Sequence, residues 1–300
     1  MRAVLEGHLG ARVVEAISER GGFSPGVASR LRLSDGRRVF AKIVSREANP
    51  DSPELHRREA EVLRQLPDGL PVPRLLSLFD DGTWAALFLE EIPGRSPRLP
   101  WDPHDLHRVL SAHERLEGRL TPSPFPAPSF LDRHAPILTA WREYAAGSRA
   151  GDTVPPDIDP WFRGRLDRLV ELEERLPCAL QGESLLHCDL RADNVLLTDD
   201  AVYFADWPHA CRGPAWADVV LFLPSVALQG GPGPAVAFEE SGLGRSADPE
   251  DVNALLAAVA GFWVRSGRRP AAPGLAPVRP FQRAQGDAAL RWLRDRLERP

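Results

Sequence analysis

Lysine is almost absent from this chain. Of its 37 basic side chains, 36 are arginine and one, Lys42, is lysine. A lysine that serves only as a solvated charge can be replaced by arginine, whereas a site that needs a compact ammonium group on a flexible stem tolerates the exchange poorly. The survival of Lys42 therefore indicates a specific role. The simpler alternative is that Lys42 is an ordinary surface lysine without a specific role.

Cysteine and long apolar runs are also scarce. The three cysteines, Cys178, Cys188 and Cys211, show no metal-ligand spacing, and their odd number favours reduced thiols in a cytosol. The N-terminus lacks the apolar core of a signal peptide, and runs such as 254–264 are too short to cross a bilayer. The net charge of −5 argues against a nucleic-acid partner. We therefore expect a cytoplasmic protein with neither membrane nor nucleic-acid partners.

The segment 187–206, HCDLRADNVLLTDDAVYFAD, contains the most informative pattern of polar residues. Asp189 is followed five residues later by Asn194, which is the Asp-to-Asn spacing of the kinase catalytic loop. Asp206 follows an apolar run, where kinases place a metal-binding aspartate. Phosphoryl transfer from a nucleotide needs one carboxylate to accept the acceptor's proton, and an amide and a second carboxylate to hold Mg²⁺.

The residues around this segment predict a β-hairpin. Two apolar runs, 195–197 and 202–204, flank a turn at Asp199-Asp200, and a further apolar run at 184–186 leads into the loop. Such a hairpin brings Asn194 and Asp206 side by side at its open end, where one Mg²⁺ can contact both. A plain hairpin with polar flanks is the alternative, because both residue types are common in turns.

Lys42 lies in a second informative segment. Residues 37–44 read as a strand that is entered from the turn signal Asp35-Gly36. In kinases the third strand carries the lysine that contacts the α and β phosphates. The sequence therefore predicts that Lys42 is a phosphate-binding residue.

Helical periodicity supplies a partner for Lys42. The chain from Ser52, as N-cap, to about Leu66 is predicted to be a helix. Glu59 falls on its apolar stripe, and an inward carboxylate is costly unless it is paired, so we expect it to bind Lys42. Glu61 lies about 200° further round the helix and should face solvent. The apolar members of the stripe are Leu55, Val62 and Leu66.

Two further segments are candidates for nucleotide contacts. The glycine-rich stretch around Ser24, GGFSPG, is a candidate loop over phosphates, although an ordinary hairpin turn explains it equally well. Residues 84–89 read as a buried strand that runs into EEIPG at 90–94. The break there predicts a hinge between two lobes, at which backbone groups of Glu91 and Ile92 pair with the adenine edge.

The C-terminal part is predicted to be helical with proline-rich connections. Three Asp-Pro pairs open helices at 102–116, 159–176 and 248–264, each with an N-cap aspartate and a proline in the first turn. His104, His107 and His113 share the first of these helices, with His113 facing inward. A metal site is conceivable there, but such histidines more often lie at a surface or boundary, and we assign them no role.

Together these motifs resemble the aminoglycoside phosphotransferase and kinase-like small-molecule phosphotransferase family. The resemblance spans roughly residues 20–225. It implies an α+β, bilobal, protein-kinase-like fold with a small antiparallel-sheet N-terminal lobe (1–92) and a larger, mainly helical C-terminal lobe (93–300). It also implies ATP and Mg²⁺ as cofactors. The roles that it implies are Asp189 as catalytic base, Asn194 and Asp206 as metal ligands, Lys42 as phosphate ligand, Glu59 as its orienting partner, and Asp218 and His187 as structural supports of the loop.

Spacing separates the chain from protein kinases. About 95 residues lie between Ile92 and His187, which leaves room for a helical insertion. The twelve-residue step from Asp206 to Asp218 leaves no room for a regulated activation loop. The predicted function is ATP-dependent transfer of the γ-phosphate to a hydroxyl of a small molecule, such as an aminoglycoside-type or other hydroxylated antibiotic.

Two alternatives to antibiotic inactivation stay open. One is a metabolic kinase for a sugar, choline-like or homoserine-like acceptor. The other is a non-catalytic nucleotide-binding pseudokinase, although such proteins usually lose the base, a metal ligand or the lysine.

The charge balance is −3 over residues 97–186 and +2 over 207–300. Neither value describes a strongly acidic cleft for a polycation, and the choice between monomer and homodimer is also open.

Overall fold

The computed structural model describes residues 2–19, 26–151, 154–271, 275 and 277–298. The chain divides into two compact units. Unit 1 consists of Met1–Pro97, Arg191–Ala210 and Ala271–Pro277, and unit 2 consists of Arg98–Leu190, Cys211–Pro270 and Val278–Pro300. The expected fold class is confirmed, because a small antiparallel sheet near the N-terminus is followed by a mainly helical remainder. The functional division into lobes at residue 92 stays a prediction.

Unit 1 is built on a five-stranded antiparallel sheet with the strand order β1-β2-β3-β5-β4. Its elements are α1 (Arg2–Leu9), β1 (Val13–Ser18), β2 (Val27–Leu33), β3 (Arg38–Ser45), α2 (Ser52–Gln65), β4 (Leu75–Asp80) and β5 (Trp84–Glu90). The strand predicted around Lys42 is thus confirmed as β3, and the buried run 84–89 as β5. The turn before β3 uses Gly36 at φ 89°, a left-handed conformation that suits glycine.

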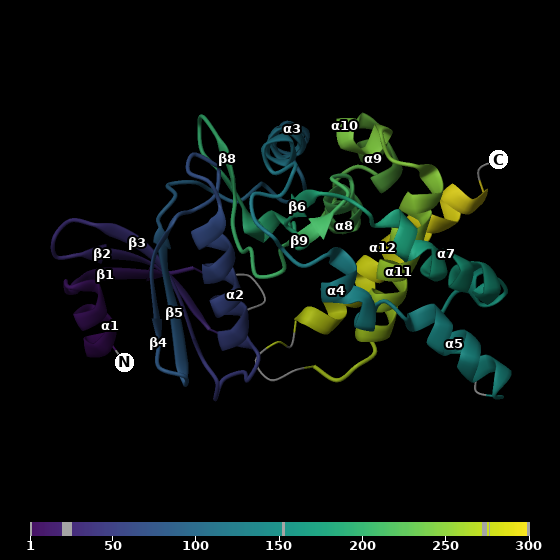
Figure 1. Ribbon diagram of the computed structural model, residues 1–300, viewed down its shortest axis with the longest axis horizontal. Helices are drawn as coiled ribbons and strands as arrows, with labels where there is room; N and C mark the ends of the chain where they lie inside the picture. Colours follow the sequence, from purple (N-terminus) through teal and green to yellow (C-terminus); the bar gives the residue numbers. More distant parts are fainter. Residues whose placement is uncertain (1, 20–25, 152–153, 272–274, 276, 299–300) are drawn as a thin grey trace. The chain divides into compact units, whose positions relative to one another are not determined.

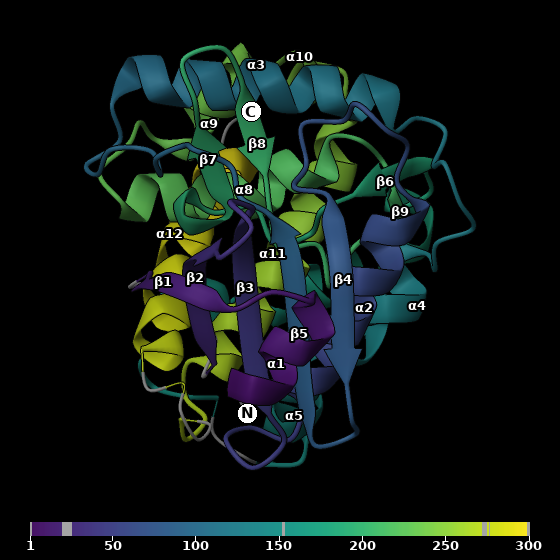
Figure 2. The same ribbon diagram turned by 90° about the vertical axis from the view of Figure 1, so that its left-hand side faces the viewer.

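The two faces of this sheet are covered differently. Helix α1 packs on one face, where Leu5 and Leu9 join a core that includes Val39 and Phe88. Helix α2 lies on the opposite face (Figures 1 and 2). Residues that pair directly across antiparallel strands point to the same face. Lys42 pairs with Ala28 and Leu87, and its side chain binds Glu59 of α2, so Lys42 lies on the α2 face.

A small hairpin completes the described part of unit 1. Strands β7 (Val195–Leu197) and β8 (Val202–Phe204) pair antiparallel, which confirms the predicted hairpin. Two backbone hydrogen bonds join Leu197 to Arg95, at 2.7 and 3.0 Å, and the amide of Phe204 donates to the carbonyl of Pro71 at 2.9 Å. The hairpin is therefore fixed to the chain that follows β5 and to the chain that precedes β4.

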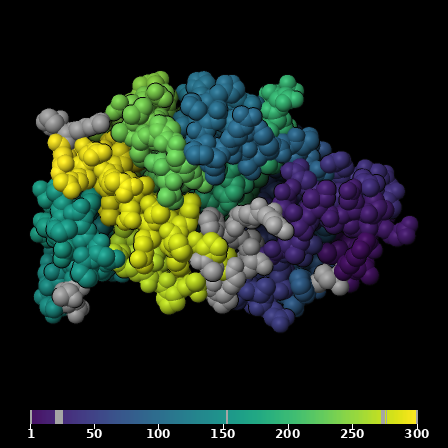
Figure 3. Space-filling model, turned by 180° about the vertical axis from the view of Figure 1, so that it is seen from behind, coloured from purple at the N-terminus to yellow at the C-terminus, as the bar shows by residue number. Residues whose placement is uncertain are grey.

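Unit 2 is mainly helical. Its two short strands, β6 (Ser184–Leu186) and β9 (Cys211–Gly213), pair antiparallel. Helix α11 is buried along most of its length and packs against α7, α8 and α12. In Figure 3 the yellow surface of the C-terminal helices adjoins the teal surface of the segment that contains α5 and α7. The helices are α3 (Pro103–Arg119), α4 (Phe130–His134), η1 (Ala135–Ile137), α5 (Ala140–Arg149), α6 (Pro160–Arg163), α7 (Leu166–Ala179), α8 (Ala217–Leu228), α9 (Pro234–Glu240), α10 (Gly242–Arg245), α11 (Pro249–Ser266) and α12 (Val278–Glu298).

Asp-Pro pairs mark helix starts as expected, with one correction. The carboxylates of Asp102 and Asp248 accept backbone N–H bonds at the starts of α3 and α11. The single helix predicted over 159–176 is wrong, because the chain forms α6 and then α7. The interruption falls at Gly164, which is a poor helix former.

The start of α2 differs from the prediction by one residue. Ser52 is the first helical residue and Asp51 is the N-cap, but the Asp51 side chain makes no capping hydrogen bond. The side-chain oxygen of Asn49 instead accepts from the amides of Asp51 and Ser52, each at 3.0 Å. The cap is thus supplied from outside the helix. Among the helices of the described residues, none is both long enough and apolar enough to cross a membrane.

Candidate active site

Lys42 binds two carboxylates in unit 1. Its Nζ donates to both carboxylate oxygens of Glu59, at 2.8 and 2.9 Å, and to Oδ1 of Asp206 at 2.9 Å. The predicted pairing of Lys42 with Glu59 is confirmed, and Glu61 is exposed as expected. The side chain of Glu59 is 2% exposed, whereas that of Asp206 is 36% exposed. We call Lys42, Glu59 and Asp206 the open cluster, because one of its carboxylates reaches solvent.

Burial and charge act against each other in the open cluster. Burial alone would lower the pKa of Lys42, but the carboxylates of Asp206 and Glu59 outweigh it and raise that pKa. Burial raises the pKa of Glu59 to about 7, against the opposing effect of Lys42. Burial lowers the pKa of the neighbouring His56 to about 4, so its ring is neutral. The lysine is thus held as an ammonium group.

The two proposed metal ligands lie at the same end of the hairpin. The carbonyl of Asn194 accepts from the amide of Ala205 at 2.9 Å. Asn194 therefore pairs across the hairpin with Ala205, the residue that precedes Asp206. Asp206 has φ 72°, a left-handed conformation that is uncommon for a non-glycine residue. Such strain is often found at functional sites, where the surrounding structure maintains it. The indole of the buried Trp207 donates to the carbonyl of Phe204 at 2.9 Å and fixes the chain after Asp206.

The residues of the expected hinge already have partners. The Arg30 guanidinium donates to the carbonyl of Ile92 at 3.0 Å and to the carboxylate of Glu91 at 3.3 Å. Arg38 also binds Glu91, and its hydrogen bond is the main cause of the lowered pKa of that carboxyl. An adenine edge that uses the Ile92 carbonyl must share it with Arg30. Ser24, the residue expected over the phosphates, lies outside the described residues.

Asp189 lies in unit 2, two residues before the chain enters unit 1 at Arg191. It is partly buried, and its amide donates to Nδ1 of His187 at 3.2 Å. The amides of His187 and Cys188 donate to the two carboxylate oxygens of Asp218, at 2.6 and 2.7 Å. Cys188 has φ 64°, so the backbone is strained directly before Asp189. A single buried carboxylate on α8 therefore fixes the loop that carries Asp189.

Asp218 belongs to a second charged cluster. Nε2 of His113, on α3, lies 3.6 Å from Oδ2 of Asp218 and 3.4 Å from Oε1 of Glu117. The three side chains are 0–3% exposed, and we call them the closed cluster. Burial disfavours the imidazolium, but the two carboxylates outweigh this and raise the pKa of His113 to about 9. Burial raises the pKa of Glu117 to about 7, whereas His113 lowers that of Asp218 despite its burial.

Comparison with known proteins identifies the family. Residues 21–261 match the sequence profile described as the phosphotransferase enzyme family. The chain belongs to this family. An aminoglycoside 3'-phosphotransferase of Streptomyces fradiae is 31% identical over 185 residues, which are 60% of this chain and 63% of that protein. The matched segment thus spans slightly less than two thirds of the relative's length.

Several solved structures have a fold similar to that of this chain. An aminoglycoside phosphotransferase in complex with ADP and hygromycin B has a TM-score of 0.64 at 15% identity, covering 97% of this chain and 98% of the other. A choline/ethanolamine kinase family protein from Mesorhizobium loti has a TM-score of 0.62 at 17% identity, covering 100% and 94%. At these identities the similarity establishes only that this phosphotransferase has a kinase-like fold.

Sequence reasoning missed two features close to the candidate site residues. It placed His113 on the inner side of its helix but assigned it no role, and it did not consider Glu117. The i, i+4 spacing of these two residues on a buried face was the available signal. It also overlooked Phe40, which pairs with Arg30 and Leu89 and so shares the sheet face of Lys42. A residue two positions before the lysine on a strand must lie on the same face.

Proposed function

We propose that this phosphotransferase transfers the γ-phosphate of ATP to a hydroxyl group of a small molecule. The observation that carries the proposal is the open cluster, in which the only lysine of the chain is held between Glu59 and Asp206. A compact ammonium with one exposed carboxylate partner is suited to bind phosphate oxygens when Asp206 turns to a metal ion. Glu59, which is buried, then keeps Lys42 in place.

The residues around Asp206 suit a magnesium ion. Carboxylate and amide oxygens are hard ligands that Mg²⁺ prefers, and Asp206 and Asn194 supply one of each. The carboxylate of Asp206 already accepts from a cation, the ammonium of Lys42 at 2.9 Å, and is 36% exposed. In this proposal Asn194 and Asp206 hold the ion, whose charge neutralises phosphate oxygens. Solved structures of similar fold contain ADP, or AMP-PNP together with Ca²⁺.

Asp189 is the proposed catalytic base. The Asp218 carboxylate accepts the amides of His187 and Cys188, the two residues before Asp189. Nδ1 of His187 accepts the amide of Asp189. A carboxylate on a fixed backbone can orient the acceptor hydroxyl and take its proton late, because the transition state of phosphoryl transfer is loose. Most of the rate then comes from positioning. His187 and Asp218 are thus proposed to be positioning residues rather than acids or bases.

The acceptor class is proposed from the relatives. The curated relative is an aminoglycoside 3'-phosphotransferase, so hydroxylated antibiotics of the aminoglycoside type are the first acceptors to test. A choline kinase from Streptococcus pneumoniae has the same fold, with a TM-score of 0.63 at 12% identity and coverage of 98% and 97%. A small metabolic alcohol is therefore the second candidate.

A mass-based acceptor screen tests the proposal. The enzyme is incubated with MgATP and a panel of aminoglycosides, other hydroxylated antibiotics, sugars and amino alcohols, and products that gain one phosphate are sought. Asp189→Asn is the matched control, since it keeps the size of the side chain and removes the base. We expect one chemical class to be phosphorylated by the wild-type enzyme alone. Equal turnover by Asp189→Asn would overturn the assignment of the base.

A further inference from the structure

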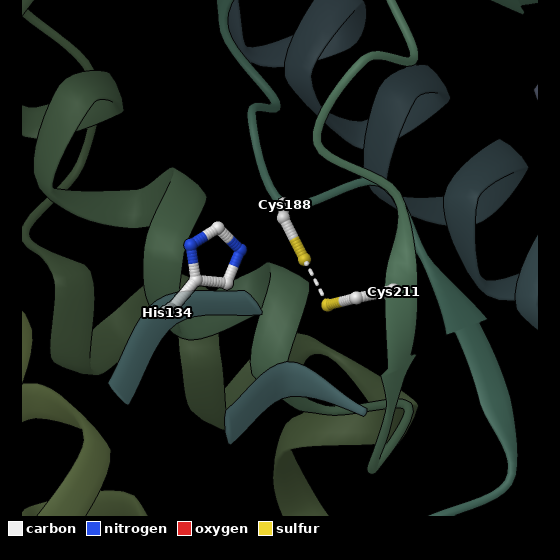
Figure 4. Close-up of side chains that lie close together, drawn as sticks. All are labelled: His134, Cys188 and Cys211. Atoms are coloured by element: carbon white, nitrogen blue, oxygen red, sulfur yellow. Dashed lines mark hydrogen bonds between the residues drawn. The ribbon is translucent and has the colours of Figure 1, made fainter. Parts of the chain in front are cut away.

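His134, Cys188 and Cys211 form a cluster of nitrogen and sulfur ligands within unit 2. The Sγ atoms of Cys188 and Cys211 lie 3.1 Å apart. A ring nitrogen of His134 and the two sulfur atoms all lie within 4.8 Å of one another. Figure 4 shows the imidazole and the two thiols approaching from three different segments. Because the residues are distant in sequence, no metal-binding motif is visible in the chain.

The fold holds each of these side chains in place. Cys211 is the first residue of β9, which pairs with β6, and Cys188 follows β6 by two residues. The amide of Cys188 is further fixed by Asp218 at 2.7 Å. His134 is the last residue of α4, and α4 packs against β9. The three groups are therefore brought together by paired backbone rather than by flexible loops alone.

We propose that His134, Cys188 and Cys211 bind a borderline-soft divalent cation of the zinc type, with the fourth position left to water or another ligand. Two thiolates and one imidazole are a common ligand set for such an ion. Mg²⁺ prefers oxygen ligands, so this site differs in chemistry from the one proposed at Asn194 and Asp206.

The distances allow this coordination after small side-chain rotations. Metal–sulfur bonds of about 2.3 Å at tetrahedral angles require the two sulfur atoms to lie about 3.8 Å apart, and sulfur and nitrogen about 3.6 Å apart. The observed sulfur–sulfur distance is 3.1 Å, and the nitrogen lies within 4.8 Å of both sulfur atoms. The ligand atoms thus need to move by roughly 1 Å.

The surrounding charge favours a cation. Burial raises the pKa of the Cys188 thiol well above its usual range, and Cys211, Asp218 and Glu117 add to this effect. On binding, two S–H bonds break, two protons pass to solvent and two sulfur–metal bonds form, with no change of oxidation state. The two carboxylates of Asp218 and Glu117 outnumber the cation beside them, His113, so the local charge attracts a dication.

The site borders the loop that carries Asp189. A metal bound to Cys188 fixes the residue directly before the proposed base, at a backbone position that is already strained. We therefore expect the ion to change the rate of phosphoryl transfer, an effect that rests on the proposed function. Metal binding itself does not, because it is measured without nucleotide or acceptor.

Cadmium is the probe for the test. The metal-free full-length protein, kept reduced with a phosphine, is titrated with Cd²⁺, and thiolate-to-cadmium charge transfer is followed in the ultraviolet. We expect one equivalent to bind, the signal to be lost in Cys188→Ala and Cys211→Ala, and the affinity to fall about tenfold or more in His134→Ala. The matched controls are Cys178→Ala, an exposed cysteine, and His104→Ala, an exposed histidine. Both should bind like the wild type.

A second measurement avoids variants that fail to fold. The ¹¹³Cd resonance of the wild-type complex should have the shift of a site with two sulfur ligands. A shift typical of oxygen ligands, an unchanged signal in Cys188→Ala or Cys211→Ala, or an equal loss in Cys178→Ala would overturn the proposal. So would a protein that takes up no cadmium at micromolar concentration. If binding is confirmed but no acceptor is found, the proposed function fails and the metal site stands.

Discussion

The open and closed clusters contain the same kinds of groups but differ in access to solvent. Each places one cationic side chain between two carboxylates. Asp206 of the open cluster is 36% exposed, whereas the three side chains of the closed cluster are 0–3% exposed. A carboxylate at the surface can exchange its partner for a ligand, whereas one that is fully buried loses its partner only at a large cost in free energy.

This difference assigns separate tasks to the two clusters. In the proposed function, Lys42 and Asp206 of the open cluster bind phosphate and metal, and Glu59 keeps the lysine in place. In the closed cluster, both carboxylate oxygens of Asp218 accept backbone amides of the loop, and His113 balances its charge. We expect changes in the open cluster to reduce activity, and changes in the closed cluster to reduce stability first.

The largest effect is expected from Asp218→Ala. Removing this carboxylate leaves the buried His113 with one partner and the loop amides without acceptors, so the free energy of unfolding should fall by about 3–5 kcal/mol. Asp206→Ala is the matched change in the open cluster, where Glu59 still pairs with Lys42, and it should cost no more than about 1 kcal/mol. Denaturant unfolding of both variants measures the difference. Equal losses would remove the distinction between the clusters.

The next effect concerns pH. The pKa of His113 is raised from 6.5 to about 9, so its contribution to stability is complete below pH 6.5 and is lost as the pH rises through 9. Its full size is about 3 kcal/mol, from 1.36 kcal/mol per pKa unit. Glu117, Asp218 and His187 are the titratable groups that act on this cluster. Unfolding free energies at pH 7 and pH 10 should therefore differ more for the wild type than for His113→Gln.

The His113→Gln variant isolates this contribution. The raised pKa of Cys188 also lowers the free energy of unfolding as the pH rises through the alkaline range. This occurs in both proteins, so the effect of Cys188 cancels in the comparison. Glutamine keeps a donor near Asp218 but cannot titrate. A pH dependence identical to that of the wild type would show that His113 is neutral in the folded protein.

The contact between Lys42 and Asp206 was not predicted from sequence, but the separate parts of the open cluster were, because their signals are local. The single lysine, the helical position of Glu59 and the hairpin around 195–204 each fix one part of it. The closed cluster needs α3 and α8 to meet, and no local pattern specifies that contact. For the same reason Cys188 and Cys211 showed no motif. The helix predicted from Asp159 is interrupted at Gly164. The prediction failed because a strong N-cap indicates where a helix begins but not how far it continues.

A smaller effect is expected from Lys42→Arg, which keeps the charge that the rest of the chain prefers. The planar guanidinium is larger than the ammonium and cannot occupy the same position between Glu59 and Asp206. We expect kcat/KM for ATP to fall about 10- to 100-fold, with a nearly unchanged free energy of unfolding. Arg46→Lys, at an exposed position directly after the same strand, is the reverse exchange and should have little effect. Unchanged kinetics in Lys42→Arg would make the scarcity of lysine a coincidence.

The smallest effect on activity is expected from exchanging one carboxylate for an amide in each cluster. Glu59 and Glu117 both have a pKa of about 7 because of burial, so replacing either with glutamine removes a desolvation cost together with an ion pair. Each change should therefore alter the free energy of unfolding by less than about 1 kcal/mol.

Nucleotide binding should separate the two variants. Glu59→Gln weakens the hold on Lys42 and should raise the Kd for MgATP about tenfold, which corresponds to about 1.4 kcal/mol, whereas Glu117→Gln has no contact with that lysine among the described residues and should leave the Kd within about twofold. An equal change in both Kd values would mean that the closed cluster also supports the nucleotide site.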